Sequence, residues 1–187
     1  CNHWRTPVKV GPYKVYASGS RALTDGILYK EPVPEIGIYL ELNWLKKFGG
    51  AAVVGAKGER LKNPFTWSWP FMVFDWPDMN VPNDVEVDKL VDYVAGLVKT
   101  GRRVEIACFG GHGRTGTLIA MLRVKLGGMK AKKAIESLRK DYCDKAVESQ
   151  SQVKAVYRIA GEPEPKFAPS PSKSYNNNYN SSWKELW

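Results

Sequence analysis

The chain has few cysteines and few histidines for its length. Its 187 residues include three cysteines and two histidines. Three cysteines are too few, and odd in number, to form a disulfide framework. The two histidines, His3 and His112, lie far apart in the sequence, and no cluster of metal ligands is apparent. The sequence therefore predicts neither a bound metal nor another cofactor.

Long apolar segments are also missing. No apolar run approaches the roughly 18–20 residues that a membrane-spanning helix needs. The first residues lack the basic-then-apolar pattern of a secretion signal. The composition is nevertheless that of a folded protein, because 43% of the residues are hydrophobic and seven are tryptophan. We expect one domain with a full core, no membrane span and a cytoplasmic location.

Acidic residues are outnumbered by basic ones. The chain has 28 Lys and Arg against 19 Asp and Glu, which gives a net charge of +9 and an isoelectric point near 9.4. A positive surface of this kind favours an anionic partner, and nucleic acid is one candidate. The basic residues are scattered along the chain without an RNA-binding signature, so a basic surface with no special partner is the alternative.

The hydrophobic pattern alternates between strands and helices. It predicts an α/β fold with a central mixed β-sheet flanked by helices. The Pro-, Ser- and Asn-rich residues 163–187 are predicted to be a flexible tail after a domain of residues 1–162. Residues 57–70 are predicted to form a loop. Strands are predicted at 13–16, 27–29, 35–44, 51–55, 71–74 and 103–107, and helices at about 84–100, 115–126, 130–140 and 149–160.

The most informative stretch runs from Cys108 to Gly116 and reads Cys-Phe-Gly-Gly-His-Gly-Arg-Thr-Gly. It joins a predicted strand to a predicted helix, so its amides and the helix dipole can form a cradle for a tetrahedral anion such as phosphate. That positive field favours a thiolate at Cys108, and Arg114 can grip two phosphate oxygens as a planar fork. The predicted phosphate-binding residues are Phe109, Gly110, Gly111, His112, Gly113 and Arg114.

This loop resembles the phosphate-binding loop of the protein tyrosine phosphatase superfamily, which includes the dual-specificity enzymes. A second motif, Trp76-Pro77-Asp78, resembles the family's general-acid loop and precedes the first motif in the same order. The resemblance covers roughly residues 35–160. It implies a cysteine-dependent phosphatase that acts on phosphotyrosine or dual-specificity protein substrates, or on another anionic phosphoester, through a phosphocysteine intermediate.

The resemblance and the chemistry together give each residue a role. Cys108 attacks phosphorus, while Arg114 and the loop amides hold the oxygens whose charge must be met in the transition state. Asp78 donates the proton to the leaving group, with Asp75 as the competing carboxylate three residues away. Thr115 donates its hydroxyl to the sulfur as it leaves, or is simply a first-turn residue of the helix. A thiolate enzyme needs a reducing compartment, in agreement with a cytoplasmic location.

Residues 146–152 are similar to the family's glutamine loop, which positions the hydrolytic water. By that match Gln152 is the better candidate and Gln150 the weaker one, while Glu148 stands where many relatives carry Gln or Glu. An exposed helix start is the alternative interpretation of this segment.

The sequence departs from the family at two positions. Ala107 stands where many members carry a histidine, so one support for the thiolate is missing. His112 within the loop is unusual, and it either adds positive charge near the phosphate or packs at the rim of the loop. Two other functions fit the same cradle: a phospho-ligand-binding module with little turnover, and a phosphatase acting on the 5′ phosphates of RNA.

Overall fold

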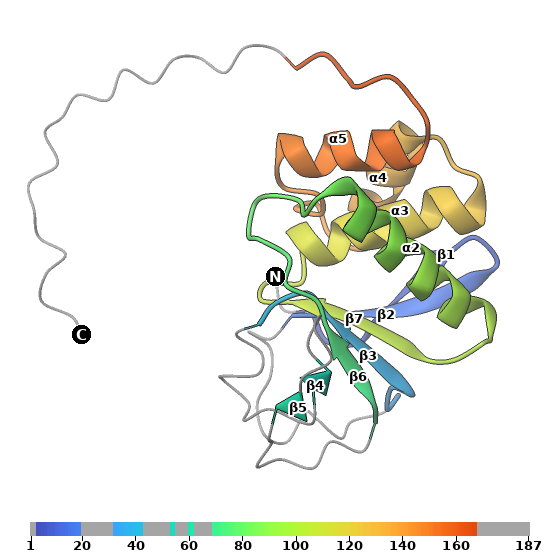
Figure 1. Ribbon diagram of the computed structural model, residues 1–187. Helices are drawn as coiled ribbons and strands as arrows, with labels where there is room; N and C mark the ends of the chain where they lie inside the picture. The colour runs from blue at the N-terminus through green and yellow to red at the C-terminus, as the bar shows by residue number, and fades with distance from the viewer. Residues whose placement is uncertain (1–2, 20–31, 43–52, 55–59, 62–68, 168–187) are drawn as a thin grey trace, which may run out of the picture.

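The computed structural model describes residues 3–19, 32–42, 53–54, 60–61 and 69–167, and five of its strands form one mixed sheet (Figure 1). The sheet has the order β1-β2-β7-β3-β6, in which β1 runs antiparallel to β2 and the other neighbours are parallel. Its strands are β1 (Thr6–Val10), β2 (Tyr13–Gly19), β3 (Ile36–Tyr39), β6 (Phe71–Val73) and β7 (Val104–Cys108).

Strand β7 occupies the centre of the sheet between β2 and β3. All five of its residues are buried, as expected for a parallel strand that is covered on both faces. The register pairs Gly19 of β2 with Cys108 and Tyr39 of β3 with Ala107. Because β7 runs parallel to β2 and β3, its end lies with theirs at the carboxyl edge of the sheet. Open α/β sheets bind their ligands at this edge.

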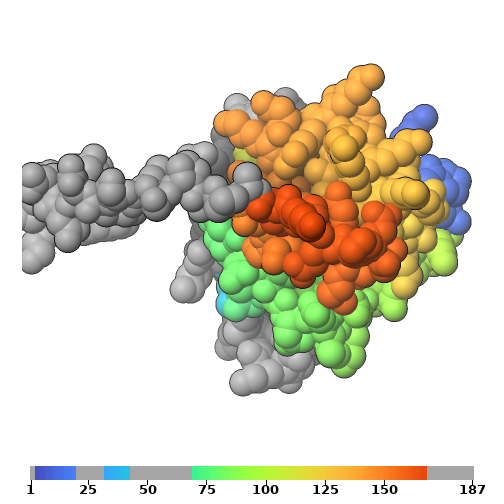
Figure 2. Space-filling model, turned by 90° about the horizontal axis from the view of Figure 1, so that it is seen from above, coloured from blue at the N-terminus to red at the C-terminus, as the bar shows by residue number. Residues whose placement is uncertain are grey.

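Four helices lie together over the sheet (Figure 1). Helix α3 is the central one, and its first eleven residues are buried. The other three form most of the surface seen from above the helices in Figure 2. The helices are α2 (Asp84–Lys99), α3 (Gly113–Gly127), α4 (Ala131–Asp141) and α5 (Gln150–Ile159). Mixed sheet and helices together confirm the predicted α/β fold class, and none of these described helices is long and apolar enough to cross a membrane.

The helix ends follow the local signals in the sequence. The Asn83 side chain caps α2 by accepting a hydrogen bond from the Glu86 amide at 3.0 Å. Ser149 and Gln152 form a capping box at the start of α5. Helix α3 ends at Gly128, whose φ of 61° is the left-handed conformation that glycine adopts without strain.

Several predicted boundaries were wrong. Strand β1 was not predicted, and residues 57–70 were predicted to be a loop although β5 (Arg60–Leu61) pairs there with β4 (Val53–Val54). Helix α3 begins at Gly113, two residues before its predicted start. The glycine-rich composition of residues 110–113 hid that start, because glycine disfavours a helix interior but is tolerated at its first turn. The predicted strand at 27–29 and the end of the predicted tail, from residue 168 onward, lie outside the described residues.

A buried polar network centred on Glu105 fixes the strands behind the site. The Ser18 hydroxyl donates to Glu105 Oε1 at 2.7 Å, and the Tyr39 hydroxyl donates to Oε2 at 2.9 Å. Arg5 Nε lies 3.3 Å from Oε1, so the carboxylate has a cationic partner. Trp69 extends the network by donating its indole N–H to the Tyr39 oxygen at 3.0 Å. Burial, and then the charge of Glu105, hold the pKa of Tyr39 well above its usual value, so its hydroxyl remains a donor.

Candidate active site

The loop from Cys108 to Arg114 connects the end of β7 to the start of α3. Cys108 is buried, and its Sγ accepts a hydrogen bond from the amide of Gly111 at 3.2 Å. His112 is the residue before α3, and its side chain makes no capping hydrogen bond to the helix. The first amides of α3 are therefore not occupied by that side chain, and the positive end of the helix dipole faces the loop.

Close packing on the end of β2 shapes the loop. A Cβ atom added to Gly19 would lie 2.8 Å from the carbonyl carbon of Gly110, too close for any other residue without a backbone shift. Gly111 has a φ of 75°, and a Cβ there would lie 3.0 Å from the Ser18 carbonyl oxygen. The Tyr142 hydroxyl donates to the Gly111 carbonyl from the other side. These contacts hold the loop in a single curved conformation.

Arg114 lies in the first turn of α3 and is only 7% exposed. Its Nη1 donates to the carbonyl oxygen of Trp76 at 3.2 Å, and its Nη2 lies 3.4 Å from Glu41 Oε2 and 3.3 Å from Asp78 Oδ1. The guanidinium thus joins three segments that are distant in sequence: the end of β3, the acid loop and α3. Glu41 was not singled out in the sequence, where nothing distinguishes it from other strand-end residues.

The loop of residues 74–80 places Asp78 over the cradle. Trp76 is buried and donates its indole N–H to the carbonyl oxygen of Asn80 at 2.8 Å, which closes the loop on itself. Met79 has a φ of 55°, uncommon for a residue with a side chain, and its carbonyl oxygen accepts a hydrogen bond from the Ser151 hydroxyl at 3.2 Å. Although 75% of the Asp78 side chain is exposed, the loop beneath it is anchored on both sides.

These elements surround a pocket of about 170 Å³. Its floor is the loop with the nucleophile, and its walls carry a carboxylate from each of two other segments. Asp75 is exposed and is not among the described residues that line the pocket, whereas Asp78 is. The lining residues are Asp78, Met79, Cys108, Phe109, Gly110, His112, Gly113, Arg114 and Glu148.

The two remaining predicted residues are buried and are not among the described residues that line the pocket. Thr115 is fully buried, and its hydroxyl has no hydrogen-bond partner within the described part of the chain. Gln152 is also fully buried, and its Oε1 accepts a hydrogen bond from the Glu148 amide at 2.8 Å. A Cβ added to Gly113 would lie 3.1 Å from Gln152 Nε2, so the amide group packs against the loop. Gln150 is exposed at the first turn of α5.

Glu148 reaches the pocket directly, and sequence reasoning gave it no role. Its carboxylate accepts a hydrogen bond from the backbone of Gly113 in the phosphate loop. Burial first, and then the negative charge of Asp78, raise the pKa of Glu148 above its usual value. Its place in the segment that resembles the glutamine loop was the available signal.

The two histidines are neighbours in the structure, contrary to what their separation in sequence suggested. The ring centroids of His3 and His112 lie 5.0 Å apart, because the segment before β1 runs alongside the phosphate loop. Sequence distance was a poor guide here, since β2 pairs with β7 and brings both segments to one edge of the sheet.

Comparison with protein families agrees with this geometry. Residues 59–128, which include both the Trp-Pro-Asp motif and the phosphate loop, match the family described as "Tc-R-P: Polymorphic toxin system, DSP-PTPase phosphatase". The matched residues are thus similar to a DSP-PTPase phosphatase domain. The resemblance that the two motifs predicted is therefore confirmed over these residues.

Curated relatives of the chain include two uncharacterized proteins of the archaeon Methanocaldococcus jannaschii. One is 39% identical over 79 residues, which are 42% of this chain and 52% of that protein. The other is 38% identical over 79 residues, again 42% of this chain and 48% of that protein. The chain thus spans about half the length of the curated relatives it matches.

Solved structures of tyrosine and dual-specificity phosphatases share the fold. Tk-PTP in its active form superposes with a TM-score of 0.60 at 16% identity, covering 84% of this chain and 98% of that one. The human tyrosine phosphatase-like serine/threonine/tyrosine-interacting protein gives 0.59 at 15% identity, covering 84% and 97%. DUSP15 gives 0.60 at 12% identity, covering 84% and 88%.

Proposed function

We propose that the protein is a cysteine-dependent phosphatase that hydrolyses phosphate monoesters through a phosphocysteine intermediate. The observation that carries the proposal is the meeting of a nucleophile, a cationic clamp and a carboxylate around one pocket: Cys108 on its floor, Arg114 at 3.3 Å from Asp78, and Asp78 on its wall. Three such groups on one cavity, drawn from two segments that are distant in sequence, favour catalysis over simple binding of a phosphorylated ligand.

In the first half of the reaction the Cys108 thiolate attacks phosphorus in line with the ester oxygen. The S–P bond forms as the P–O bond to the leaving group breaks, and the protonated Asp78 carboxyl gives its proton to the departing oxygen. The amides of residues 109–114 and the Arg114 guanidinium hold the three equatorial oxygens. Proton donation of this kind typically contributes about 10²–10⁴-fold to the rate.

In the second half a water molecule attacks the phosphocysteine and inorganic phosphate leaves. Asp78, now ionised, accepts the proton from that water, and the sulfur departs as a thiolate. The buried hydroxyl of Thr115, which has no hydrogen-bond partner in the described segments, is the group we assign to the departing sulfur. We assign water positioning to Gln152 with Glu148, because the first packs against the loop and the second lines the pocket.

For the substrate we propose phosphorylated side chains of proteins in the cytoplasm, with phosphotyrosine preferred. Two apolar side chains line the pocket with substantial exposure, Phe109 at 39% and Met79 at 52%. They offer contact surface to an aromatic leaving group, which an alkyl phosphate uses less well. The preference is measured as kcat/KM on peptides carrying phosphotyrosine or phosphoserine, with a phosphoinositide and an RNA 5′ phosphate alongside.

The proposal is tested by replacing the nucleophile. Cys108→Ser should abolish hydrolysis of an aryl phosphate yet still bind the phosphate analogue tungstate, because the cradle and clamp remain. Cys1→Ser makes the same chemical change at a cysteine outside both motifs, and it should leave turnover unchanged. Undiminished turnover in Cys108→Ser would overturn the proposed mechanism. If RNA were the physiological substrate instead, activity on an RNA 5′ phosphate would exceed activity on a phosphopeptide and would fall steeply as the salt concentration rises.

A further inference from the structure

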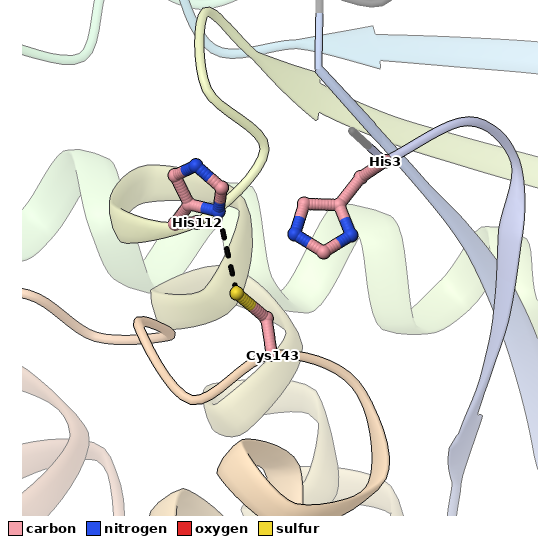
Figure 3. A group of neighbouring side chains, drawn as sticks. All are labelled: His3, His112 and Cys143. Atoms are coloured by element: carbon pink, nitrogen blue, oxygen red, sulfur yellow. Dashed lines mark hydrogen bonds between the residues drawn. The ribbon is translucent and has the colours of Figure 1, made fainter. Parts of the chain in front are cut away.

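Three metal-binding side chains from separate parts of the chain meet beside the phosphate loop. They are His3 before β1, His112 within the loop, and Cys143 after α4 (Figure 3). One nitrogen or sulfur atom of each lies within 4.8 Å of the others, and His112 Nδ1 lies 3.4 Å from Cys143 Sγ. His3 and Cys143 are buried, and His112 is partly exposed.

His3 has the properties of a metal ligand. It is only 8% exposed, and its Nε2 is buried without a hydrogen-bond partner among the described residues. In Figure 3 the imidazole ring points toward the sulfur of Cys143 and the ring of His112. Burial, and then the positive charge of His112, lower the pKa of His3 to about 4, so the ring is neutral at neutral pH. The neutral imidazole is the form that binds metals, and a buried nitrogen without a partner is otherwise unfavourable.

The spacing of the three atoms suits a tetrahedral ion. Zinc binds nitrogen at about 2.0–2.1 Å and sulfur at about 2.3 Å, which places two such ligands of one ion about 3.6 Å apart. The observed 3.4 Å between His112 Nδ1 and Cys143 Sγ agrees with this separation. The widest separation, within 4.8 Å, closes to the same value with side-chain shifts of about 1 Å.

We propose that His3, His112 and Cys143 form a binding site for a thiophilic divalent cation of the Zn²⁺ type, with the fourth position open to water. Two imidazoles and one thiolate are a donor set that zinc accepts and that magnesium and calcium do not. The Asp144 carboxylate, with Oδ1 at 3.8 Å from Cys143 Sγ, adds negative charge that attracts the cation.

Binding replaces one proton by the metal. Burial raises the pKa of Cys143, so the ion must displace the thiol proton to form the sulfur–metal bond, and one proton is released to solvent. An ion bound here ties the phosphate loop through His112 to the segment before β1 and to the turn after α4. Tyr142 already donates to the Gly111 carbonyl in that loop, so the ion adds a second, stronger connection at the same place.

The test uses the full chain with Cys1→Ser and Cys108→Ser together, in which Cys143 is the one remaining thiol. After treatment with a chelator, Zn²⁺ is titrated in competition with a chromophoric chelator, and Co²⁺ is added in a parallel sample. We expect one Zn²⁺ per chain, a rise in melting temperature with Zn²⁺, and a thiolate-to-cobalt charge-transfer band. Absence of that band, or of stoichiometric Zn²⁺ binding, overturns the site.

Substitutions assign the ligands. In the same background, His3→Phe and Cys143→Ala should each weaken Zn²⁺ binding by more than the roughly 10–100-fold that outer-shell changes produce. Tyr142→Phe removes a neighbouring hydroxyl but no ligand and should bind Zn²⁺ like its parent. Unchanged affinity in His3→Phe and Cys143→Ala would contradict the assignment. Because the parent lacks the nucleophile, these results are independent of whether the wild-type protein hydrolyses phosphate esters.

Discussion

The structure has two buried arginine–glutamate pairs, Arg5–Glu105 and Arg114–Glu41, and they differ in what else surrounds them. In the first, the side chains of Arg5 and Glu105 are each 1% exposed, and both carboxylate oxygens of Glu105 accept hydrogen bonds from hydroxyl groups. In the second, Arg114 and Glu41 lie beside the pocket, and Arg114 also contacts the exposed carboxylate of Asp78. The first pair is enclosed by protein, whereas the Arg114 of the second pair lines the pocket.

The difference separates a structural ion pair from a functional one. Arg5 lies between Trp4 and Trp69, with its guanidinium carbon 4.7 Å and 5.0 Å from their ring centroids, so no substrate can reach it. Arg114 is oriented by Glu41 and by the Trp76 carbonyl, while its contact with Asp78 lies on the pocket side. A phosphate entering the pocket can take the place of that contact. Fixing one side of a guanidinium while leaving the other replaceable is what a phosphate clamp requires.

The largest expected effect comes from Arg114→Lys. A lysine keeps the charge but lacks the planar fork, so we expect kcat/KM for an aryl phosphate to fall by about 10³-fold or more. The free energy of unfolding should change little. Arg5→Lys is the matched change in the enclosed pair, and it should lower the melting temperature while leaving kcat/KM of the folded fraction close to wild type. Equal losses of activity in the two variants would contradict the distinction.

The next largest effect is expected for Asp78→Asn. This change removes the exposed carboxylate that contacts Arg114. We expect kcat to fall by about 10²–10³-fold on a phosphate ester with a poor leaving group, and by much less on one with a good leaving group that needs no proton. Asp75→Asn, three residues away and exposed, is the control and should retain wild-type kcat. The assignment is wrong if Asp75→Asn carries the larger loss.

A smaller effect, on stability rather than turnover, is expected for Glu105→Gln. Removing this carboxylate leaves Arg5 as a buried cation without its ionic partner, and such changes cost about 3–5 kcal/mol of unfolding free energy. Chemical denaturation followed by tryptophan fluorescence measures the loss. A variant as stable as wild type would show that the network around Glu105 contributes little to the fold.

The smallest effect is expected for Glu41→Gln. Glutamine can still accept a hydrogen bond from Arg114, so the clamp is loosened rather than lost, and we expect kcat/KM to fall by about 10-fold. The free energy of unfolding should fall less than in Glu105→Gln, because the Arg114 guanidinium keeps two carbonyl acceptors. A Glu41→Gln variant less stable than Glu105→Gln would reverse the comparison.

The sequence predicted the parts of the site that are local in the chain. The loop from Cys108 to Arg114 joins a strand to a helix, and its glycines and charges are visible as one motif. The cap at Ser149 and the stop at Gly128 were equally readable, because each depends on neighbouring residues. The short strand β1 was not predicted, because its alternating pattern spans only five residues and includes a proline, Pro7.

What could not be predicted depends on contacts between distant segments. Glu41 lies beside Arg114 only because β3 and β7 are neighbours in the sheet. The meeting of His3 and His112 depends likewise on the pairing of β2 with β7. Periodicity and spacing carry no information on such pairings, so the contact of Glu41 with Arg114 and the meeting of the two histidines are visible only in the folded chain.

Rapid-quench kinetics with an excess of aryl phosphate tests whether Cys108 forms a phosphocysteine. We expect a burst of one phenol per chain before steady turnover, with phosphate covalently attached to Cys108 in the quenched protein. The Cys108→Ser variant should show neither the burst nor the covalent phosphate. Steady turnover with the label on another residue, or binding of the ester without any burst or turnover, would contradict a phosphocysteine mechanism.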